Sequence, residues 1–434
     1  MLITVIGLGR LGLVHAAVMA KLGHEVIAIE SSAERVELLK SGAVPFFEPG
    51  LDDLMTDVAQ TGRLTFYNEH PAQSREAELH FICVGTPQSA TGEEADTSYV
   101  FDAATKLASF MASTSVVVGK STVPVGTAKS VSEILERGAG SPRHVVWNPE
   151  FLREGHAVAD TMKPDRIVLG SESAEAEAKA RQGYQSIIDL GVPVVSCDFQ
   201  TAELVKVAAN AFLATKISFI NAIAEVAENT GANTEQIAEA LGLDDRIGRK
   251  FLNNGLGYGG GCLPKDSRSM KHIAEQVGAD GLSSLLAAVE QVNVGRKNRV
   301  LELARLQLGT IPGKRVAVLG AAFKPNTDDI RDSPAIDIAQ RFHDAGATVV
   351  VQDEMAIENV RRDLPHFEAV SDVSDAFENA DLVVIATEWR SYTAILPSDV
   401  ESLVKHKNMI LARKVVDEKL WQDHGWNVKA LGRA

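Results

Sequence analysis

The chain is poor in cysteine, in aromatic residues and in positive charge, and these shortages exclude several classes of protein. Its three cysteines, Cys83, Cys197 and Cys262, are too few and too far apart for a disulfide framework or for a zinc site of C-x-x-C type. We therefore expect a reducing, cytoplasmic environment and no bound metal. The 43 Lys and Arg residues are outnumbered by 58 Asp and Glu, so the formal net charge is −15. Because no long basic run is present, we expect no binding to nucleic acid or to anionic membranes.

The sequence also lacks a long uninterrupted apolar run. Its most apolar stretch, residues 205–227, contains Lys206, Asn210, Lys216 and Asn221, which argues against a membrane span. The N-terminus starts at once with a strand-like run and shows no signal-peptide pattern. The rest of the composition, 45% hydrophobic and 23% charged over 434 residues, is typical of a globular protein of about three domain lengths.

Short apolar runs rich in β-branched residues alternate with helical patterns at both ends of the chain. The predicted strands are residues 2–6, 25–29, 79–84, 115–120, 143–147, 166–169, 314–319, 347–351 and 382–386. Such alternation predicts parallel sheets with helices on both faces. Between them, residues 201–308 have helical periodicity and almost no strand signal. We predict an α/β fold of two Rossmann-like doubly wound domains joined by a central helical region, with boundaries 1–200, 201–308 and 309–434.

A glycine motif lies between the first predicted strand and the first helix. Gly7, Gly9 and Gly12 have the spacing G-x-G-x-x-G, which in this context indicates a dinucleotide-binding turn. The free N–H groups of the helix start would face a pyrophosphate. Glu30 follows the second strand, where a carboxylate accepts hydrogen bonds from ribose hydroxyls and repels a 2′-phosphate. NAD is therefore favoured over NADP, although the nearby Arg35 would favour the opposite choice.

Cys262 is the most informative single residue. It follows the glycine-rich stretch 255–261 and precedes Lys265 and Asp266. Glycine lets a loop approach a ligand closely or hold strained geometry. A nearby cation favours the nucleophilic thiolate form of cysteine. The alternative, a small buried hydrophobic residue, suits the other two cysteines better.

Polar residues interrupt the apolar segment 200–221 at regular spacing. Glu203, Lys206, Asn210 and Asn221 would lie on one face of a helix. Polar groups on a buried helix need partners. The spacing fits a functional site and an interhelical ion pair with a hydrogen-bonded asparagine equally well.

Two further segments follow predicted strands and would lie at the carboxyl edge of the first sheet, where open α/β sheets bind ligands. Residues 148–155 carry Glu150 and Glu154, and Ser121 and Thr122 follow another strand. The alternative interpretations are a helix-starting loop whose acids complement the helix dipole, and a simple helix cap.

Taken in chain order, these motifs resemble the UDP-glucose/GDP-mannose dehydrogenase family over nearly the whole chain. The matching motifs are GLGRLG from Gly7, CVGTP from Cys83, STVPVGT from Ser121, NPEFLREG from Asn148, the helix with Glu203, Lys206 and Asn210, DRIG from Asp245, GLGYGGGCLPKD from Gly255, and FKPNTDDIRDSP from Phe323. One stretch departs from the family pattern. The family often has Asp-x-Arg-Asn near the C-terminus, where this chain has Leu411-Ala412-Arg413-Lys414.

The resemblance implies a four-electron oxidation of a nucleotide sugar at C6, with two NAD reduced. A cysteine at the position of Cys262 forms a thiohemiacetal and then a thioester, which water hydrolyses. The family pattern assigns the first proton and the oxyanions to Lys206, Asp266 and Asn210. It assigns the hydrolytic step to Glu150 and a water-positioning role to Thr122.

The resemblance also implies binding residues. The expected cofactor contacts are Gly7, Gly9, Arg10, Leu11, Gly12, Glu30, Arg35, Gly85, Thr86, Pro87, Ser121, Thr122, Glu154, Cys262, Lys265 and Arg331. The expected substrate contacts are Glu150, Phe151, Leu152, Arg153, Glu154, Lys206, Asn210, Arg246, Phe251, Leu252, Asn253, Gly255, Gly257, Tyr258, Gly259 and Lys324. Family members form homodimers through the central helices, and the arginine of DRIG reaches into the partner subunit.

The segment from Asp244 to Asp266 most resembles the branch that converts UDP-glucose, two NAD and water to UDP-glucuronate and two NADH. GDP-mannose or a UDP-N-acetylhexosamine is the alternative substrate. A one-step β-hydroxyacid dehydrogenase would need neither Cys262 nor a second α/β domain. A non-catalytic nucleotide-sugar-binding protein would not need the set of cysteine, lysine, asparagine and aspartate.

Overall fold

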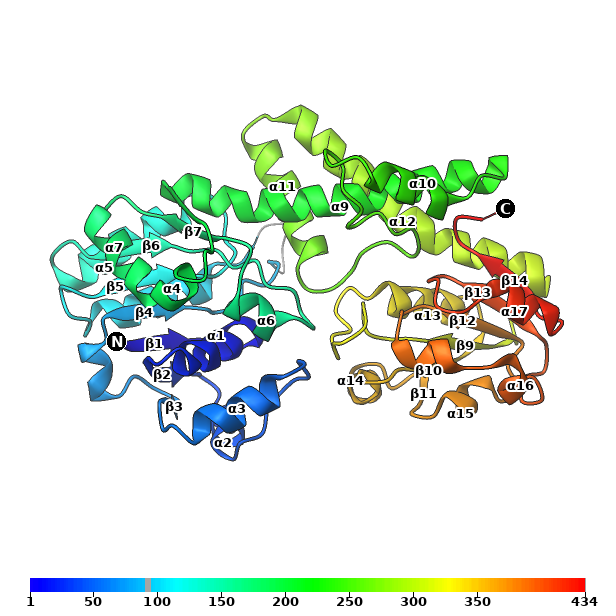
Figure 1. Ribbon diagram of the computed structural model, residues 1–434, viewed down its shortest axis with the longest axis horizontal. Helices are drawn as coiled ribbons and strands as arrows, with labels where there is room; N and C mark the ends of the chain where they lie inside the picture. The colour runs from blue at the N-terminus through cyan, green and yellow to red at the C-terminus, as the bar shows by residue number, and fades with distance from the viewer. Residues whose placement is uncertain (90–94, 434) are drawn as a thin grey trace. The chain divides into compact units, whose positions relative to one another are not determined.

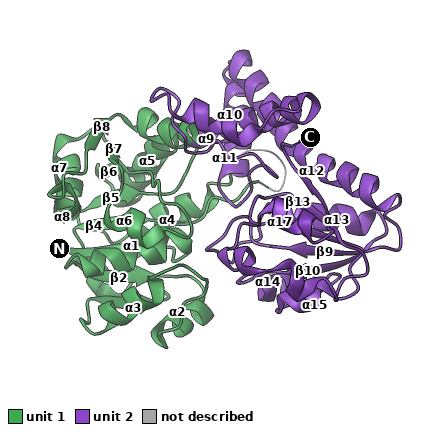
Figure 2. Cartoon of the chain, turned by 45° about the vertical axis from the view of Figure 1, so that its right-hand side comes forward, with its two compact units in different colours: residues 1–209 green, residues 210–434 purple. Residues whose placement is uncertain are grey.

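The computed structural model describes residues 1–89 and 95–433. The chain forms two compact units, residues 1–209 and 210–434, which Figure 2 colours separately. Each unit is built around a β-sheet covered by helices, as predicted for the two ends of the chain (Figure 1).

Among the described residues, the first unit holds an eight-stranded sheet in the order β3-β2-β1-β4-β5-β6-β7-β8. Its strands are β1 (Leu2–Ile6), β2 (Glu25–Ile29), β3 (Leu64–Tyr67), β4 (Leu79–Ile82), β5 (Val116–Gly119), β6 (His144–Trp147), β7 (Ile167–Gly170) and β8 (Val194–Cys197). Its helices are α1 (Arg10–Lys21), α2 (Ala33–Lys40), α3 (Leu51–Ala59), η1 (Ala72–Glu76), α4 (Ser98–Ala108), α5 (Thr127–Ala139), α6 (Ala157–Met162), α7 (Ala174–Gly183) and α8 (Gln185–Ile188).

Helices cover both faces of this sheet, as the strand–helix alternation predicted. Within β5, Val116 and Val118 contribute to one buried core and Val117 to the other, because successive strand residues point to opposite faces. The first core also includes Leu13 of α1, and the second includes Leu135 of α5. The sheet is therefore buried on both sides, which explains its continuous apolar strands.

The prediction of a wholly parallel sheet is wrong at one pair. β6 and β7 pair antiparallel through Trp147 and Gly170, whereas the other neighbouring pairs are parallel. The segment between them, residues 148–166, carries only the six-residue helix α6. Without a full crossover helix, the chain turns back at the carboxyl edge of the sheet and β7 runs in the opposite direction.

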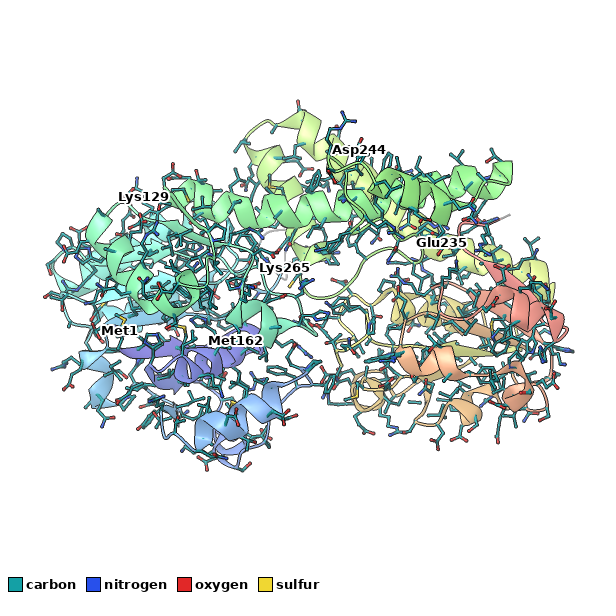
Figure 3. The ribbon with its side chains drawn as sticks, viewed as in Figure 1. Met1, Lys129, Met162, Glu235, Asp244 and Lys265 are labelled. Carbon is teal, nitrogen blue, oxygen red and sulfur yellow. The ribbon has the colours of Figure 1, made fainter. Side chains whose placement is uncertain are left out.

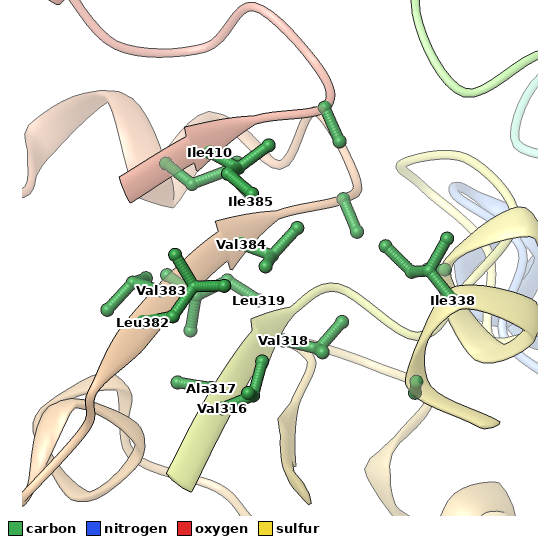
Figure 4. Close-up of a cluster of buried hydrophobic side chains, with 14 of the residues drawn as sticks. Val316, Ala317, Val318, Leu319, Ile338, Leu382, Val383, Val384, Ile385 and Ile410 are labelled. Carbon is green, nitrogen blue, oxygen red and sulfur yellow. The ribbon is translucent and has the colours of Figure 1, made fainter. Parts of the chain in front are cut away.

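The second unit holds a six-stranded parallel sheet in the order β11-β10-β9-β12-β13-β14 among its described residues. The strands are β9 (Arg315–Leu319), β10 (Thr348–Gln352), β11 (Glu368–Val370), β12 (Leu382–Ile385), β13 (Asn408–Leu411) and β14 (Asn427–Ala430). Its core is centred on β9 and β12, whose side chains pack with Ile338 and Ile410 (Figure 4).

The helices of this part of the chain fall into two groups. The helical region contains α9 (Phe199–Thr230), α10 (Thr234–Gly242), α11 (Leu263–Gln276) and α12 (Asp280–Leu308). The helices associated with the second sheet are α13 (Pro334–Asp344), α14 (Ile357–Asp363), α15 (Val373–Phe377), η2 (Arg390–Ala394), α16 (Pro397–Val400) and α17 (Glu418–Asp423). The predicted central helical region is confirmed, except that residues 243–262 contain no helix.

Helix α9 is long and apolar enough to cross a membrane by length and composition, with a mean hydropathy of 1.4 in its most apolar window. A core helix of a soluble protein meets the same criterion. Two of its polar side chains have partners within the protein: Ser218 Oγ donates to the carbonyl of Val289, and Asn221 Oδ1 accepts the N–H of Gly255. These contacts are those of a helix that packs inside a folded protein.

Candidate active site

The glycine turn after β1 has the geometry of a pyrophosphate-binding turn. Gly7 has φ +88°, and its N–H donates to the carbonyl of Ile29 at 2.8 Å. A β-carbon on Gly12 would overlap the carbonyl oxygen of Gly7, whereas one on Gly9 would meet nothing within 4 Å. The first and third glycines are therefore required for packing, and the second leaves space at the start of α1 for a phosphate group. Leu11 packs against the core beside this turn.

Glu30 lies where a ribose-binding carboxylate is expected. Its Oε2 accepts the N–H of Leu8 at 3.1 Å and its Oε1 accepts the N–H of Ser32 at 3.1 Å. Arg35 Nη1 lies 3.6 Å from Oε2, so the cation that would suit a 2′-phosphate faces this carboxylate. The guanidinium of Arg10 lies 5.0 Å from the centre of the Phe46 ring at the helix start. These residues fit NAD, because the buried carboxylate occupies the place of a 2′-phosphate.

The loops after β4 and β5 are bound to each other. Ser121 Oγ donates to the carbonyl of Val84 at 2.6 Å, and Thr86 Oγ1 donates to the carbonyl of Thr122 at 2.7 Å. The structure thus brings together the predicted residues of two motifs at the carboxyl edge of the sheet, namely Gly85, Thr86, Pro87, Ser121 and Thr122. The alternative that Ser121 or Thr122 caps a helix is wrong, since the N-cap of α5 is Gly126.

Lys206 and Glu150 form a buried ion pair. Lys206 Nζ lies 3.3 Å from Glu150 Oε1, and only 4% of the lysine is exposed. Glu150 Oε2 accepts the N–H of Leu152 at 2.6 Å, and the Phe151 ring centre lies 5.5 Å from Lys206 Nζ. Glu150, on the loop after β6, is therefore a partner of Lys206. A buried amine beside a carboxylate can exchange a proton with a substrate hydroxyl.

Two other polar residues named in the sequence analysis, Arg153 and Glu203, make contacts that stabilise the fold. Arg153 forms a two-pronged ion pair with Asp160, with N–O distances of 2.8 and 2.7 Å. Glu203 accepts the N–H groups of Gly126 and Ala128, at 2.7 and 2.6 Å, and so caps the start of α5. Burial raises the pKa of the Glu203 carboxyl above its usual value. The polar face of α9 therefore contains one capping residue beside the candidate site residues.

Cys262 is the N-cap of α11 and is exposed. A thiolate at this position would face the positive end of the helix dipole. One turn further, the N–H of Asp266 donates to the carbonyl of Cys262 at 2.9 Å. Asp266 Oδ2 accepts a hydrogen bond from Asn210 Nδ2 at 2.6 Å, and Asp266 Oδ1 lies 2.8 Å from Lys265 Nζ (Lys265 is labelled in Figure 3). With 1% exposure, Asp266 is a buried carboxylate held by an amide and an ammonium.

The other two cysteines behave differently from Cys262. Cys83 is buried at the end of β4, and burial raises the pKa of its thiol to about 12. Burial also raises the pKa of Cys197, at the end of β8. Neither is a candidate nucleophile at neutral pH, because the thiolate is the reactive form.

The glycine-rich loop before Cys262 is packed mainly against the protein itself. A β-carbon on Gly257 or Gly259 would overlap Asn293 Oδ1 or the carbonyl oxygen of Asp332. The carbonyl of Gly257 accepts a hydrogen bond from Arg413 Nη2 at 2.5 Å. Asn293 accepts the N–H of Tyr258 at 2.8 Å and donates to its carbonyl at 3.1 Å. The glycines thus hold a tightly packed and unusual backbone course that leads to Cys262.

Arg413 is the residue that the atypical C-terminal stretch retains from the family pattern. Its contact with Gly257 connects that stretch to the glycine-rich loop. Its neighbour Lys414 forms an ion pair with Glu235. Neither this contact nor that of Asn293 was predicted, because their partners lie far away in the sequence.

The loop of residues 244–253 contains a second unusual backbone conformation. Phe251 has φ +65°, which is rare for a residue with a side chain and is often found at functional sites. Arg246 is exposed and forms an ion pair with Asp244 at 2.6 Å. Leu252 is 2% exposed and packs in a core cluster, so its side chain is not available to a ligand. Asn253 Oδ1 accepts a hydrogen bond from Arg249 Nη1 at 2.7 Å.

The loop after β9 carries the remaining predicted residues. Lys324 Nζ lies 5.4 Å from the centre of the Phe323 ring. Arg331 forms a close ion pair with Asp329 and remains 61% exposed. A β-carbon on Gly261 would meet the Arg331 guanidinium at 2.7 Å, so this cation lies beside the residue that precedes Cys262.

No group of three or more His, Cys, Asp or Glu residues that could hold a metal ion occurs in the described part of the chain.

Three family models match the chain. Residues 1–188 match the NAD binding domain, residues 200–294 the central domain and residues 317–418 the UDP binding domain of the UDP-glucose/GDP-mannose dehydrogenase family. The chain belongs to this family.

Individual relatives span the whole chain. It is 39% identical to a UDP-glucose 6-dehydrogenase of Rhizobium meliloti, with 100% of both proteins covered. It is 40% identical to UDP-glucose 6-dehydrogenase TuaD of Bacillus subtilis, over 99% of this chain and 93% of that protein. A solved UDP-glucose dehydrogenase from Pyrobaculum islandicum is 35% identical with a TM-score of 0.91, covering 100% of this chain and 98% of that one. A UDP-D-ManNAc dehydrogenase from Pyrococcus horikoshii is 25% identical with a TM-score of 0.86, covering 100% and 99%.

Proposed function

We propose that this protein oxidises UDP-glucose to UDP-glucuronate, with two NAD reduced for each sugar. The observation that carries the proposal is the position of Cys262 at the start of α11, one turn before the buried Asp266. A simple alcohol dehydrogenase needs no thiol here, whereas oxidation of an aldehyde to an acid needs a nucleophile that holds it. The full-length likeness to UDP-glucose 6-dehydrogenases supports UDP-glucose as the sugar.

The first oxidation requires a base for the C6 hydroxyl. Lys206 in its neutral form, held in place by Glu150, would take the hydroxyl proton and become the ammonium of the ion pair. NAD bound at the glycine turn supplies the hydride acceptor. Asn210 and Asp266 would then orient the aldehyde and stabilise the negative oxygen that forms when Cys262 attacks.

The second half of the reaction begins from the thiohemiacetal, a tetrahedral carbon that can lose a second hydride. Lys206, which gives a proton to the oxygen when the thiohemiacetal forms, would take the hydroxyl proton back as the hydride leaves. The product is a thioester on Cys262. Water then attacks the acyl carbon, the carbon–sulfur bond breaks, and Cys262 leaves as a thiolate. We assign the acceptance of the water proton to Glu150 and the orientation of the water to Thr122. Arg331, Glu154 and Lys265 would contact the cofactor, and Lys324 and Arg246 the nucleotide sugar.

The test is the yield of NADH with limiting sugar. Purified protein and excess NAD are supplied with UDP-glucose, UDP-N-acetylglucosamine, UDP-N-acetylmannosamine or GDP-mannose, and each reaction is run to completion. We expect two NADH per UDP-glucose, and no NADPH when NADP replaces NAD. A yield of one NADH per sugar would support a one-step dehydrogenase. A yield of two NADH from another sugar would leave the proposed mechanism intact and change only the proposed substrate.

We further propose three functional parts, residues 1–200 for NAD, 201–308 for dimer formation and 309–434 for the UDP-sugar. Exposed apolar side chains at Phe212, Phe219 and Val226 support the dimer, with 65%, 52% and 59% exposure. They are spaced seven residues apart and so form one stripe along α9. An exposed apolar stripe of this kind suits a second copy of the chain better than water. We also propose a cytoplasmic protein that binds neither nucleic acid nor membranes.

The variant Phe219→Glu tests the dimer. A buried charge in the stripe should weaken self-association at least about tenfold, as measured by sedimentation equilibrium. Activity should fall with it if Arg246 completes the site of the partner subunit. The control is Leu420→Glu on α17, which replaces an exposed leucine outside the stripe. It should change neither self-association nor activity. An unchanged association constant in Phe219→Glu would contradict the proposed interface.

A further inference from the structure

Lys120 is a buried lysine to which the proposed reaction assigns no role. It directly follows β5 and is 7% exposed. Its Nζ donates to Asn148 Oδ1 at 3.0 Å and to Tyr184 Oη at 3.3 Å. Both partners are neutral. Burial lowers the pKa of this lysine, since an ammonium loses hydration that neutral partners only partly replace.

The groups around Lys120 form a closed network. Tyr184 Oη donates to Asn148 Oδ1 at 2.6 Å, and Asn148 Nδ2 donates to the carbonyl of Val168 at 2.8 Å. Burial raises the pKa of Tyr184, so its hydroxyl stays a neutral donor. The amide oxygen of Asn148 therefore accepts two hydrogen bonds and its amide nitrogen donates one. Such a satisfied buried network fixes the orientation of its members.

The network joins two loops that carry proposed catalytic residues. Lys120 lies two residues before Thr122, and Asn148 lies two residues before Glu150. The N–H of Asn148 also donates to the carbonyl of Gly119 at 2.8 Å. The bond between the two side chains thus continues the pairing of β5 and β6 beyond the last strand residues. Pro149 restricts the backbone between Asn148 and Glu150. The position of the Asn148 side-chain amide therefore determines where the Glu150 carboxylate lies.

We infer that Lys120 is a positioning residue for hydrolysis of the thioester. By holding Asn148, it fixes the loop of Glu150 against the loop of Thr122, so that the attacking water meets its proton acceptor in the correct place. This inference rests on the proposed function. Hydride transfer depends on Glu150 only through its ion pair with Lys206. It should therefore be affected far less than hydrolysis, in which Glu150 itself accepts the proton.

The test is Lys120→Met, which keeps most of the side-chain volume and removes the ammonium. Rapid mixing with excess UDP-glucose and NAD should show a burst of two NADH per subunit at the rate of the unchanged protein. Steady turnover should then fall at least about tenfold, because the thioester accumulates. Because only a step after both hydride transfers is slowed, KM should fall with kcat, and kcat/KM for both substrates should stay within about twofold. The matched control is Lys129→Met, an exposed lysine on α5 (labelled in Figure 3), which should change nothing.

Adding hydroxylamine distinguishes a positioning role of Lys120 in hydrolysis from a role in packing alone. Hydroxylamine attacks thioesters without general-base help, so it should restore turnover of Lys120→Met and yield the hydroxamate of the sugar acid. A merely structural lysine would lower burst and steady rates together, and hydroxylamine would restore neither; that outcome overturns the inference. If Lys120→Met does not fold, Tyr184→Phe should show the same intact burst and slowed hydrolysis more weakly, and equal loss of both would overturn it.

Failure of the proposed function would be seen in the unchanged protein. In that case it would release one NADH per sugar and form no hydroxamate. A failure confined to Lys120→Met, with two NADH and hydroxamate from the unchanged protein, would overturn the inference alone.

Discussion

Replacing Cys262 with serine is expected to lower steady oxidation of UDP-glucose by at least on the order of 10³-fold. A serine hydroxyl at the start of α11 is a much weaker nucleophile than a thiolate, and an ester is a poorer acyl donor to water than a thioester. The second oxidation and the hydrolysis both depend on the sulfur. The first hydride transfer does not, so we expect the variant to keep its affinity for NAD and UDP-glucose.

The measurement combines the NADH yield with mass spectrometry of the intact protein. Unchanged protein stopped during turnover should carry a sugar-acyl adduct on Cys262, and Cys262→Ser should carry none. Cys197→Ser is the matched control, since Cys197 is half-buried at the end of β8 and its Sγ lies 3.8 Å from the carbonyl of Leu169. Two NADH per sugar from Cys262→Ser at a normal rate would rule out the thioester route.

Replacing Gly257 with alanine is expected to lower kcat on the order of 10²-fold, although Gly257 itself takes no part in the chemistry. Gly257 has φ +90°, and a β-carbon there would overlap Asn293 Oδ1. The loop can relieve this overlap only by breaking the two hydrogen bonds between Asn293 and the Tyr258 peptide or by shifting the backbone toward Cys262. Together with the cost of a left-handed conformation, we expect a loss of about 2–4 kcal/mol in the free energy of unfolding.

Gly281→Ala is the control for the same chemical change. Gly281 is exposed in the first turn of α12, where a β-carbon would meet nothing within 4 Å. Its replacement should leave kcat unchanged and raise stability by up to about 1 kcal/mol. Denaturant unfolding and initial rates measure both variants. If Gly257→Ala matches Gly281→Ala in both measurements, the packing of the loop does not hold Cys262 in place.

The prediction of strands was accurate where the apolar signal was strong. The strands at residues 2–6 and 25–29 are confirmed with the predicted bounds, and the other predicted strands lie within one or two residues of theirs. The strands β3, β8 and β11 were missed. They lie at sheet edges and consist of exposed and partly buried residues, so their composition resembles that of loops. β13 and β14 were missed as well.

The sequence by itself determined the dinucleotide turn and the motif around Cys262. In the first, strand, glycines and helix start follow one another within about a dozen residues, and in the second, glycines lead directly to a helix start. In both, the local backbone course sets the geometry. The order of the motifs likewise indicated the family before any contact was known. Charge and cysteine content led us to expect no nucleic-acid binding, no disulfide framework and no metal site.

Only the tertiary structure decided which residues meet. It shows that Glu203 caps α5 whereas Lys206 forms an ion pair. It also shows that β7 runs antiparallel to β6 and that Asn293 lies in the space beside Gly257. It also placed Lys120 on Asn148, 28 residues away. These contacts join segments far apart in the chain, and their partners are chosen by packing and by the need to satisfy buried polar groups. Local pattern carries no information on that choice, because the same polar residue on a buried face can be satisfied by many different neighbours.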